Sequence, residues 1–188
     1  MKTLVSFDVE VSGRVPGEHS MIQLGAVAFN MEGVEVSKFC MNLQPLSDVV
    51  GKSTMDWWAT QSKEAWEKVT SNPKPAVEVC RKFMDWLAQF PKPVLYAAPV
   101  QFDGMWLRWY LEKFVGESGS HLFHRALDAR SVVWALTGYY EGDWKARVAA
   151  ITACQIVNPS PHYALADARE QGQYLFALLE WNEKQKHK

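Results

Sequence analysis

The stretch Lys2-Thr3-Leu4-Val5-Ser6-Phe7-Asp8-Val9-Glu10 predicts a β-strand that begins almost at the first residue. Successive side chains of a strand point to opposite faces, so Asp8 and Glu10 share one face. Leu4 and Ser6 lie on that same side, while Val5, Phe7 and Val9 fill the opposite side. Two carboxylates on one face repel each other and lose hydration unless a cation lies between them or both reach water. The strand alone leaves both interpretations open.

The remaining chain predicts one mixed β-sheet with helices on its faces. Short connections follow this strand and join two further expected strands, over residues 21–29 and 34–43, which indicates an antiparallel meander. The later expected elements are short helices within 55–69, a helix between Pro75 and Pro91, a strand over 94–98, a helix opened by Asp103, a short strand over 124–127, and helices near 128–136, 144–154 and 164–181. This order is typical of an α/β domain. We therefore expect a single domain over 1–182, built on a five-stranded sheet, and a polar tail over 183–188.

Composition excludes several classes of protein. The chain has 188 residues and a formal net charge of −1, which argues against a strong non-specific nucleic-acid binder. It does not exclude an enzyme that holds a few nucleotides through metal ions. No apolar run approaches the roughly 20 residues of a membrane span, and no signal segment opens the chain. The three cysteines are widely spaced, which favours free thiols and a cytoplasmic protein.

Two further acids fall where this fold would bring them near the first strand. Asp103 follows the apolar stretch 94–98, and Asp167 lies in the first turn of the expected last helix. Each could simply favour a helix start through the helix dipole. If they converge with Asp8 and Glu10, the four carboxylates would form a site for hard divalent cations. His162 would then be placed to accept a proton from water.

Four short motifs together resemble those of a known nuclease family. They are Phe7-Asp8-Val9-Glu10, Gln23-Leu24-Gly25, Phe102-Asp103 and His162-Tyr163-Ala164-Leu165-Ala166-Asp167. Their order and spacing resemble the DEDDh family of DnaQ-like 3′–5′ exonucleases, which have a ribonuclease-H-like fold. The resemblance runs from about residue 3 to 180 and therefore implies the same fold for the whole domain.

The resemblance implies a two-metal-ion reaction with two Mg²⁺ or Mn²⁺ ions as cofactors. Asp8 would contact both ions, Glu10 and Asp167 would complete the first site, and Asp103 would hold the second. His162 would be the general base that activates the attacking water. The enzyme would cleave the 3′-terminal phosphodiester of single-stranded DNA, RNA or both, and would release nucleoside 5′-monophosphates. The expected partner is a single-stranded nucleic acid with a free 3′ end.

Some positions depart from the family pattern or are open to two interpretations. Val11 stands where the family usually has a threonine that helps to hold the terminal nucleotide, and Ser12 could supply a hydroxyl instead. Trp57 and Trp58 are candidates for stacking on a base, with core packing as the alternative. Tyr163 lies four residues before Asp167 and is a rival base, although His162 has the matching spacing.

Two other functions fit the same fold. The chain could be a catalytically silent module that binds nucleic acid or a partner, but such a module has no reason to keep all four acids and the histidine. An endonuclease of the ribonuclease-H-like group would release internal fragments instead of mononucleotides. Some members of the family form homodimers, and a homodimer is one of the assemblies expected here. No motif fixes contacts to the 2′-position, so DNA and RNA are both expected substrates.

Overall fold

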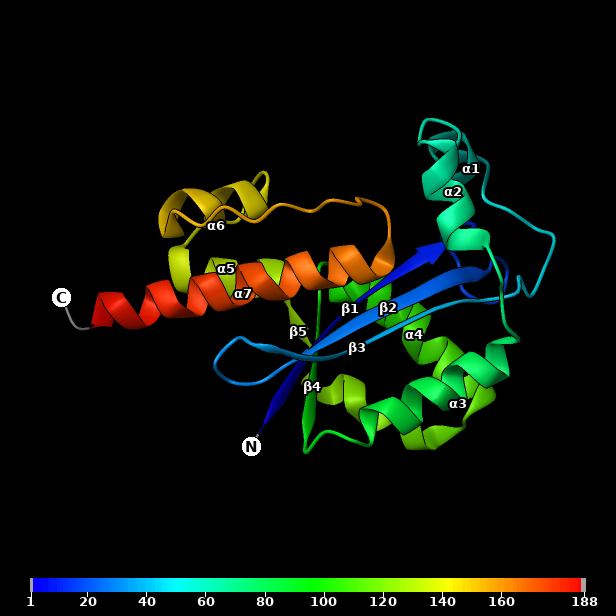
Figure 1. The fold of residues 1–188 in the computed structure, drawn as a ribbon, viewed down its shortest axis with the longest axis horizontal. Helices are drawn as coiled ribbons and strands as arrows, with labels where there is room; N and C mark the ends of the chain where they lie inside the picture. Colours follow the sequence, from blue (N-terminus) through cyan, green and yellow to red (C-terminus); the bar gives the residue numbers. More distant parts are fainter. Residues whose placement is uncertain (1, 187–188) are drawn as a thin grey trace.

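The computed structural model describes residues 2–186 and contains the expected mixed sheet of five strands, in the order β3-β2-β1-β4-β5 (Figure 1). β1 pairs antiparallel with β2, and β2 pairs antiparallel with β3, whereas β4 is parallel to both β1 and β5. The strands are β1 (Thr3–Val11), β2 (Met21–Phe29), β3 (Glu35–Asn42), β4 (Pro93–Ala97) and β5 (Leu127–Asp128). The N-terminal meander and the mixed sheet are thus confirmed.

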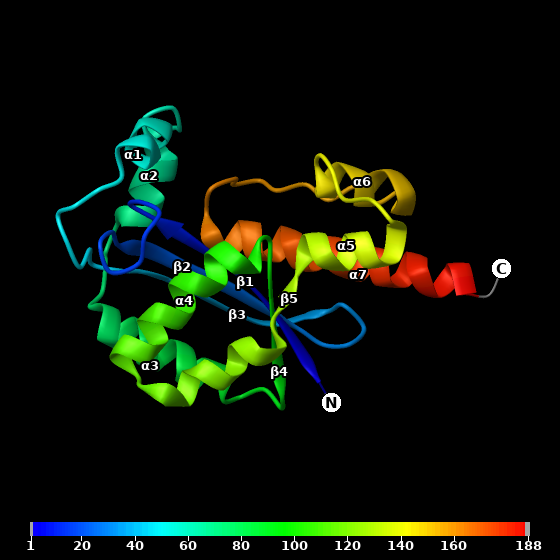
Figure 2. The same ribbon diagram turned by 180° about the vertical axis from the view of Figure 1, so that it is seen from behind.

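Helices cover both faces of the sheet, as Figures 1 and 2 show. Their bounds are α1 (Lys52–Trp58), α2 (Lys63–Thr70), α3 (Ala76–Leu87), α4 (Val100–Phe114), the 3₁₀-helix η1 (Glu117–Arg125), α5 (Ala129–Thr137), α6 (Trp144–Thr152) and α7 (Ala164–Lys186). α3 and α4 pack on one face, where they share a core with β1. α5, α6 and α7 pack on the other face. The alternation of β1 decides which of its side chains enters which core.

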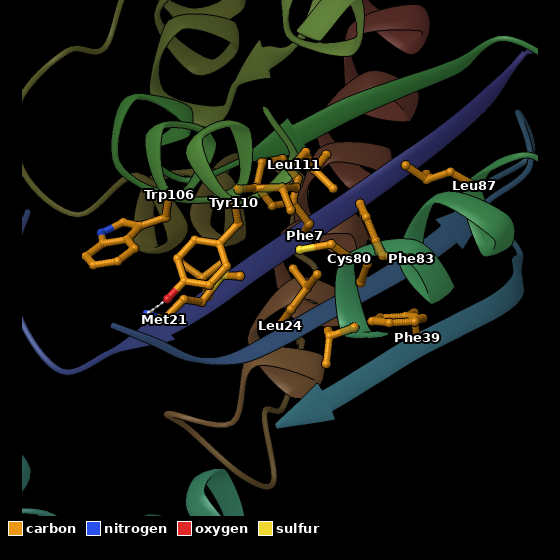
Figure 3. Close-up of a cluster of buried hydrophobic side chains, with 14 of the residues drawn as sticks. Phe7, Met21, Leu24, Phe39, Cys80, Phe83, Leu87, Trp106, Tyr110 and Leu111 are labelled. Carbon is orange, nitrogen blue, oxygen red and sulfur yellow. Dashed lines mark hydrogen bonds between the residues drawn. The ribbon is translucent and has the colours of Figure 1, made fainter. Parts of the chain in front are cut away.

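The core beneath α3 and α4 takes Val5, Phe7 and Val9 from β1. Figure 3 shows Phe7 among the side chains of this core, where the Tyr110 hydroxyl accepts a hydrogen bond of 2.8 Å from the Met21 backbone N–H. The opposite face of β1 carries Leu4, which belongs to the core beneath α7. Asp8 and Glu10 therefore lie on the α7 side of the sheet, as the period of the strand predicts.

α7 lies directly against the sheet because glycine stands where the backbones approach. A Cβ atom added at Gly25 of β2 would come within 2.2 Å of the Leu165 backbone nitrogen, at the start of α7. Farther along, a Cβ at Gly172 of α7 would come within 2.3 Å of the Phe29 ring. The Gln23 side chain also accepts a hydrogen bond of 2.8 Å from the Ala164 backbone N–H. These contacts fix the first turn of α7 over β1 and β2.

Several boundaries differ from the sequence prediction. α4 begins at Val100, so Asp103 lies inside its first turn instead of opening it, and the Asp128 carboxylate accepts a hydrogen bond from the Val100 N–H. The expected strand over 124–127 is wrong in part, because η1 extends to Arg125 and the strand itself is only Leu127–Asp128. The tail expected from residue 183 is helical through Lys186, and residues 187–188 lie outside the described part. Ion pairs along α7 support this extension: Glu180 with Lys184 and Glu183 with Lys186.

Two expectations from composition can be compared with the structure. Cys40, Cys80 and Cys154 are free thiols, as the spacing predicts. Over residues 2–186, no helix combines the length and the apolar character that crossing a membrane requires.

Candidate active site

The start of α7 lies beside β1, as Figure 1 shows. Three carboxylates meet at this point. Asp8 and Glu10 come from β1, and Asp167 comes from the first turn of α7. One oxygen from each of the three lies within 4.8 Å of the others. The two ends of the chain therefore supply one cluster, which could hold a hard cation through oxygen ligands.

Asp103 reaches this cluster from the other side of β1. Its side chain is only 4% exposed, and its Oδ1 accepts a hydrogen bond of 3.4 Å from the Val9 backbone N–H. Asp103 lies outside the group of three carboxylates that are within 4.8 Å of one another. It is still close enough for its charge to act on Asp8 and Glu10.

The acids carry more negative charge than their surroundings balance. Burial is the largest cause that raises the pKa of Asp8 well above its ordinary value, and the neighbouring carboxylates raise it further. Burial also raises the pKa of Glu10 well above its ordinary value and that of Asp103 to about 7. Among residues 2–186, no ion pair includes any of these four acids.

Asp167 differs from the other acids because several groups stabilise its charge. Burial raises its pKa, but the charge of Lys145 and hydrogen bonds from Asn158 and from the His162 backbone oppose that increase. Clustered oxygen ligands with unbalanced buried charge match the chemistry of a divalent cation such as Mg²⁺ or Mn²⁺. The residues present thus fit the metal site that the motifs imply.

The backbone of His162 is bound to one acid of the cluster. Its φ of +62° is in the left-handed region, and its N–H donates a hydrogen bond of 2.9 Å to Asp167 Oδ2. Its ring packs edge-on against Trp57, with 4.7 Å between the ring centroids. Tyr163 is placed differently: Lys68 lies 3.8 Å above its ring centroid, and its hydroxyl interacts with Cys40 of β3. Tyr163 thus faces the β3 edge of the sheet.

The predicted substrate-binding residues have different surroundings. Trp57 is 39% exposed, whereas Trp58 is 4% exposed and donates a hydrogen bond of 3.2 Å from Nε1 to the Val11 carbonyl oxygen. Val11 is buried in the core beneath α3 and α4. Ser12 is also buried, and its hydroxyl accepts a hydrogen bond of 2.9 Å from the Ser20 N–H. Of the two tryptophans, Trp57 is the one whose ring a base could reach.

Sequence analysis missed two amides that bind the acids directly. Gln171 donates from Nε2 to Asp8 Oδ1 at 2.9 Å. Asn158, in the loop before α7, donates from Nδ2 to Asp167 Oδ1 at 2.6 Å and to Glu170 Oε2 at 3.2 Å. The spacing of four residues between Asp167 and Gln171 is a signal that both lie on one helix face. The sequence around Asn158 contains no comparable signal.

Comparisons with known proteins identify the family of the chain. A family model described as a 3′–5′ exoribonuclease Rv2179c-like domain matches residues 3–179. The 3′–5′ DNA exonuclease Cap18 of Escherichia coli is 29% identical over 185 residues, which cover 94% of this chain and 90% of Cap18.

Solved structures resemble the chain in fold. E. coli exonuclease I, in a complex with a dT13 oligonucleotide, superposes with a TM-score of 0.71 at 14% identity, over 100% of this chain and 43% of that one. The chain thus spans less than half the length of exonuclease I. Pop2p of S. pombe, in a form with bound Mg²⁺ and Mn²⁺, superposes with a TM-score of 0.67 at 13% identity, over 92% of this chain and 81% of that one. These neighbours show that the chain has a ribonuclease-H-like fold.

Proposed function

The chain belongs to the Rv2179c-like family of 3′–5′ exoribonuclease domains, and from that membership we propose that it shortens single-stranded RNA or DNA from the 3′ end in a reaction that requires divalent metal ions. The observation that carries the proposal is the approach of Asp8, Glu10 and Asp167 to within 4.8 Å of one another. The buried carboxylate of Asp103 lies beside them. Four acids from three separate segments have no structural reason to converge in a partly buried site unless a cation joins them.

The four acids have distinct roles in this proposal. Asp8, Glu10 and Asp167 would hold one ion, and Asp103 would hold a second together with Asp8. Two Mg²⁺ or Mn²⁺ ions would supply positive charge that stabilises the attacking and leaving oxygens of the phosphodiester. The raised pKa of Asp103, about 7, is a property of the metal-free cluster, since a nearby cation favours the ionised carboxylate.

His162 would act as the general base. An imidazole nitrogen would accept a proton from water, and the water oxygen would attack the terminal phosphorus. The bond between phosphorus and the 3′-oxygen of the preceding nucleotide would break, and that oxygen would take a proton from solvent. The product would be a nucleoside 5′-monophosphate. The hydrogen bond from the His162 N–H to Asp167 supports this role, because it ties the base to a metal ligand.

Trp57 would contribute to binding of the strand. Its ring is partly exposed and touches the His162 ring, so a nucleobase stacked on it would lie next to the proposed general base. Stacking on an aromatic ring tolerates any base, which suits an enzyme that removes nucleotides in succession. The partner would be a single-stranded nucleic acid with a free 3′ end.

Digestion of 5′-labelled single-stranded DNA and of its RNA counterpart tests the proposal. With Mg²⁺ or Mn²⁺, we expect a ladder that shortens from the 3′ end, and a chelator should abolish it. Asp103→Asn keeps an oxygen acceptor for the Val9 N–H but removes the negative charge, so the ladder should be lost. His162→Ala removes the general base and should slow the reaction by about 10²–10⁴-fold. Asp85→Asn, at an exposed position of α3, is the matched control.

The relative rates on the two substrates decide between RNA and DNA. Internal fragments would indicate an endonuclease. Purified, folded protein that cleaves neither substrate with either metal would overturn the proposed activity.

A further inference from the structure

Gln171 has no role in the reaction described so far, yet it contacts a central acid. It lies on α7 one turn after Asp167, its side chain is 3% exposed, and its Nε2 donates a hydrogen bond of 2.9 Å to Asp8 Oδ1. Its amide oxygen, Oε1, is buried and has no hydrogen-bond partner among the described residues. A buried polar atom without a partner is costly, so some other contact must favour this arrangement.

The contact with Asp8 explains the orientation of the amide. If the amide turned over, Oε1 would face the Asp8 carboxylate, and two hydrogen-bond acceptors would then repel each other. The neighbouring residue Gly172 lies against the Phe29 ring, so the backbone of α7 is held close to the sheet at this point. The side chain is therefore fixed at its backbone by packing and at its tip by the carboxylate.

α7 thus helps to place two carboxylates of the cluster. It supplies Asp167 directly, and four residues later it supplies the amide that holds Asp8. The hydrogen bond occupies Oδ1 of Asp8. Within residues 2–186, Oδ2 of Asp8 receives no hydrogen bond from the chain, so it remains available to a cation.

We propose that Gln171 is a positioning residue that sets the rotation of the Asp8 carboxylate for divalent-metal binding. This inference rests on the proposed function, because it assumes that Asp8 is a metal ligand. Groups that hydrogen-bond to metal ligands fix the orientation of those ligands, and their loss lowers metal affinity by about 10–100-fold. Without Gln171, the carboxylate would rotate between several orientations and bind the ion less tightly.

Direct metal binding tests the inference apart from catalysis. Gln171→Met keeps the length and most of the volume of the side chain but removes the N–H donor. Isothermal titration with Mn²⁺, in the absence of nucleic acid, should show affinity weaker by about 10–100-fold. Gln171→Asn, which keeps the amide but shortens the side chain, should also weaken binding and serves if the Met variant does not fold. Gln173→Met, at an exposed position of the same helix, should bind Mn²⁺ like the unmodified protein.

A second readout separates positioning from a purely structural role. In the Gln171 variants, the Mg²⁺ concentration that gives half-maximal activity should rise, while kcat at saturating Mg²⁺ should fall less than the affinity. A lower Tm in chelator with unchanged Mn²⁺ affinity would overturn the inference and leave Gln171 as a packing residue. Absence of Mn²⁺ binding by the unmodified protein would instead overturn the metal-dependent function on which the inference rests.

Discussion

Gly25→Ala is expected to displace the catalytic end of α7. Gly25 lies opposite Asp8 in the pairing of β2 with β1, and α7 begins directly above it. An added Cβ would lie 2.2 Å from the Leu165 nitrogen and 2.3 Å from the Ala164 carbonyl carbon. Both atoms belong to the backbone, so no side-chain rotation can relieve the contact. The first turn of α7 must therefore move away from the sheet.

The size of the effect follows from these distances. Favourable contacts between heavy atoms need about 3.5 Å, so the helix start must move by about 1 Å. Overpacking of this kind costs about 1–3 kcal/mol, and weakening the hydrogen bond from the Ala164 N–H to Gln23 adds about 1 kcal/mol. At about 2–4 °C per kcal/mol for a chain of this length, the Tm should fall by about 4–16 °C. Since Asp167 lies in the displaced turn, a 1 Å error in its position should lower activity by about 10²-fold.

The assay combines thermal unfolding in chelator with digestion of a labelled oligonucleotide. Gly104→Ala is the matched control, because its Cβ would lie 3.2 Å from Val100 Cγ2 and 3.7 Å from the Phe123 ring, much less crowded than at Gly25, and alanine favours the helix. We expect Gly104→Ala to keep or raise the Tm. If Gly25→Ala left both the Tm and the activity unchanged, the close approach of α7 would not be what positions Asp167.

Three further predictions concern charge and contacts around the site. In chelator, stability should decrease as pH rises from about 4 to 7, because the pKa of Asp103 is about 7 in the folded protein and about 3.9 when unfolded. Asp103→Asn should reduce that slope in Tm measurements across this range, and an unchanged slope would contradict the assignment. Trp57→Ala should raise the KM for single-stranded oligonucleotides by about 5–150-fold, because about 1–3 kcal/mol of base stacking is lost. A KM equal to that of the unmodified enzyme would argue against base contact. Lys145→Met removes the 2.6 Å ion pair with the mostly buried Glu170 and should lower the free energy of unfolding in urea by about 1–2 kcal/mol, so equal urea midpoints would show that the pair contributes nothing.

Local geometry explains why part of the candidate site was predictable. The alternation of a strand places Asp8 and Glu10 on one face whatever the strand packs against. The buried residues of α3 recur at helical spacing, and Asp128 caps α5 by accepting a hydrogen bond from the Ser131 N–H. These features depend on residues within one or two turns of each other, so the sequence alone contains them.

Features that depend on the meeting of distant segments were not predictable. Trp57 and Trp58 are adjacent in sequence, yet only the docking of α1 on Val11 decides that the second is buried and the first is exposed beside His162. No local pattern predicted that an amide would bind Asp8 from 163 residues away.

The sequence by itself determined most of the helices and strands, the shared face of Asp8 and Glu10, and the order of motifs that indicates a 3′–5′ exonuclease. Only the tertiary structure decided how the four acids approach one another, which tryptophan is accessible, and that Gln171 holds Asp8. The physical reason is that strand and helix periods are local properties of the backbone. The direction of a buried polar side chain is instead set by the packing and hydrogen bonds of segments from opposite ends of the chain.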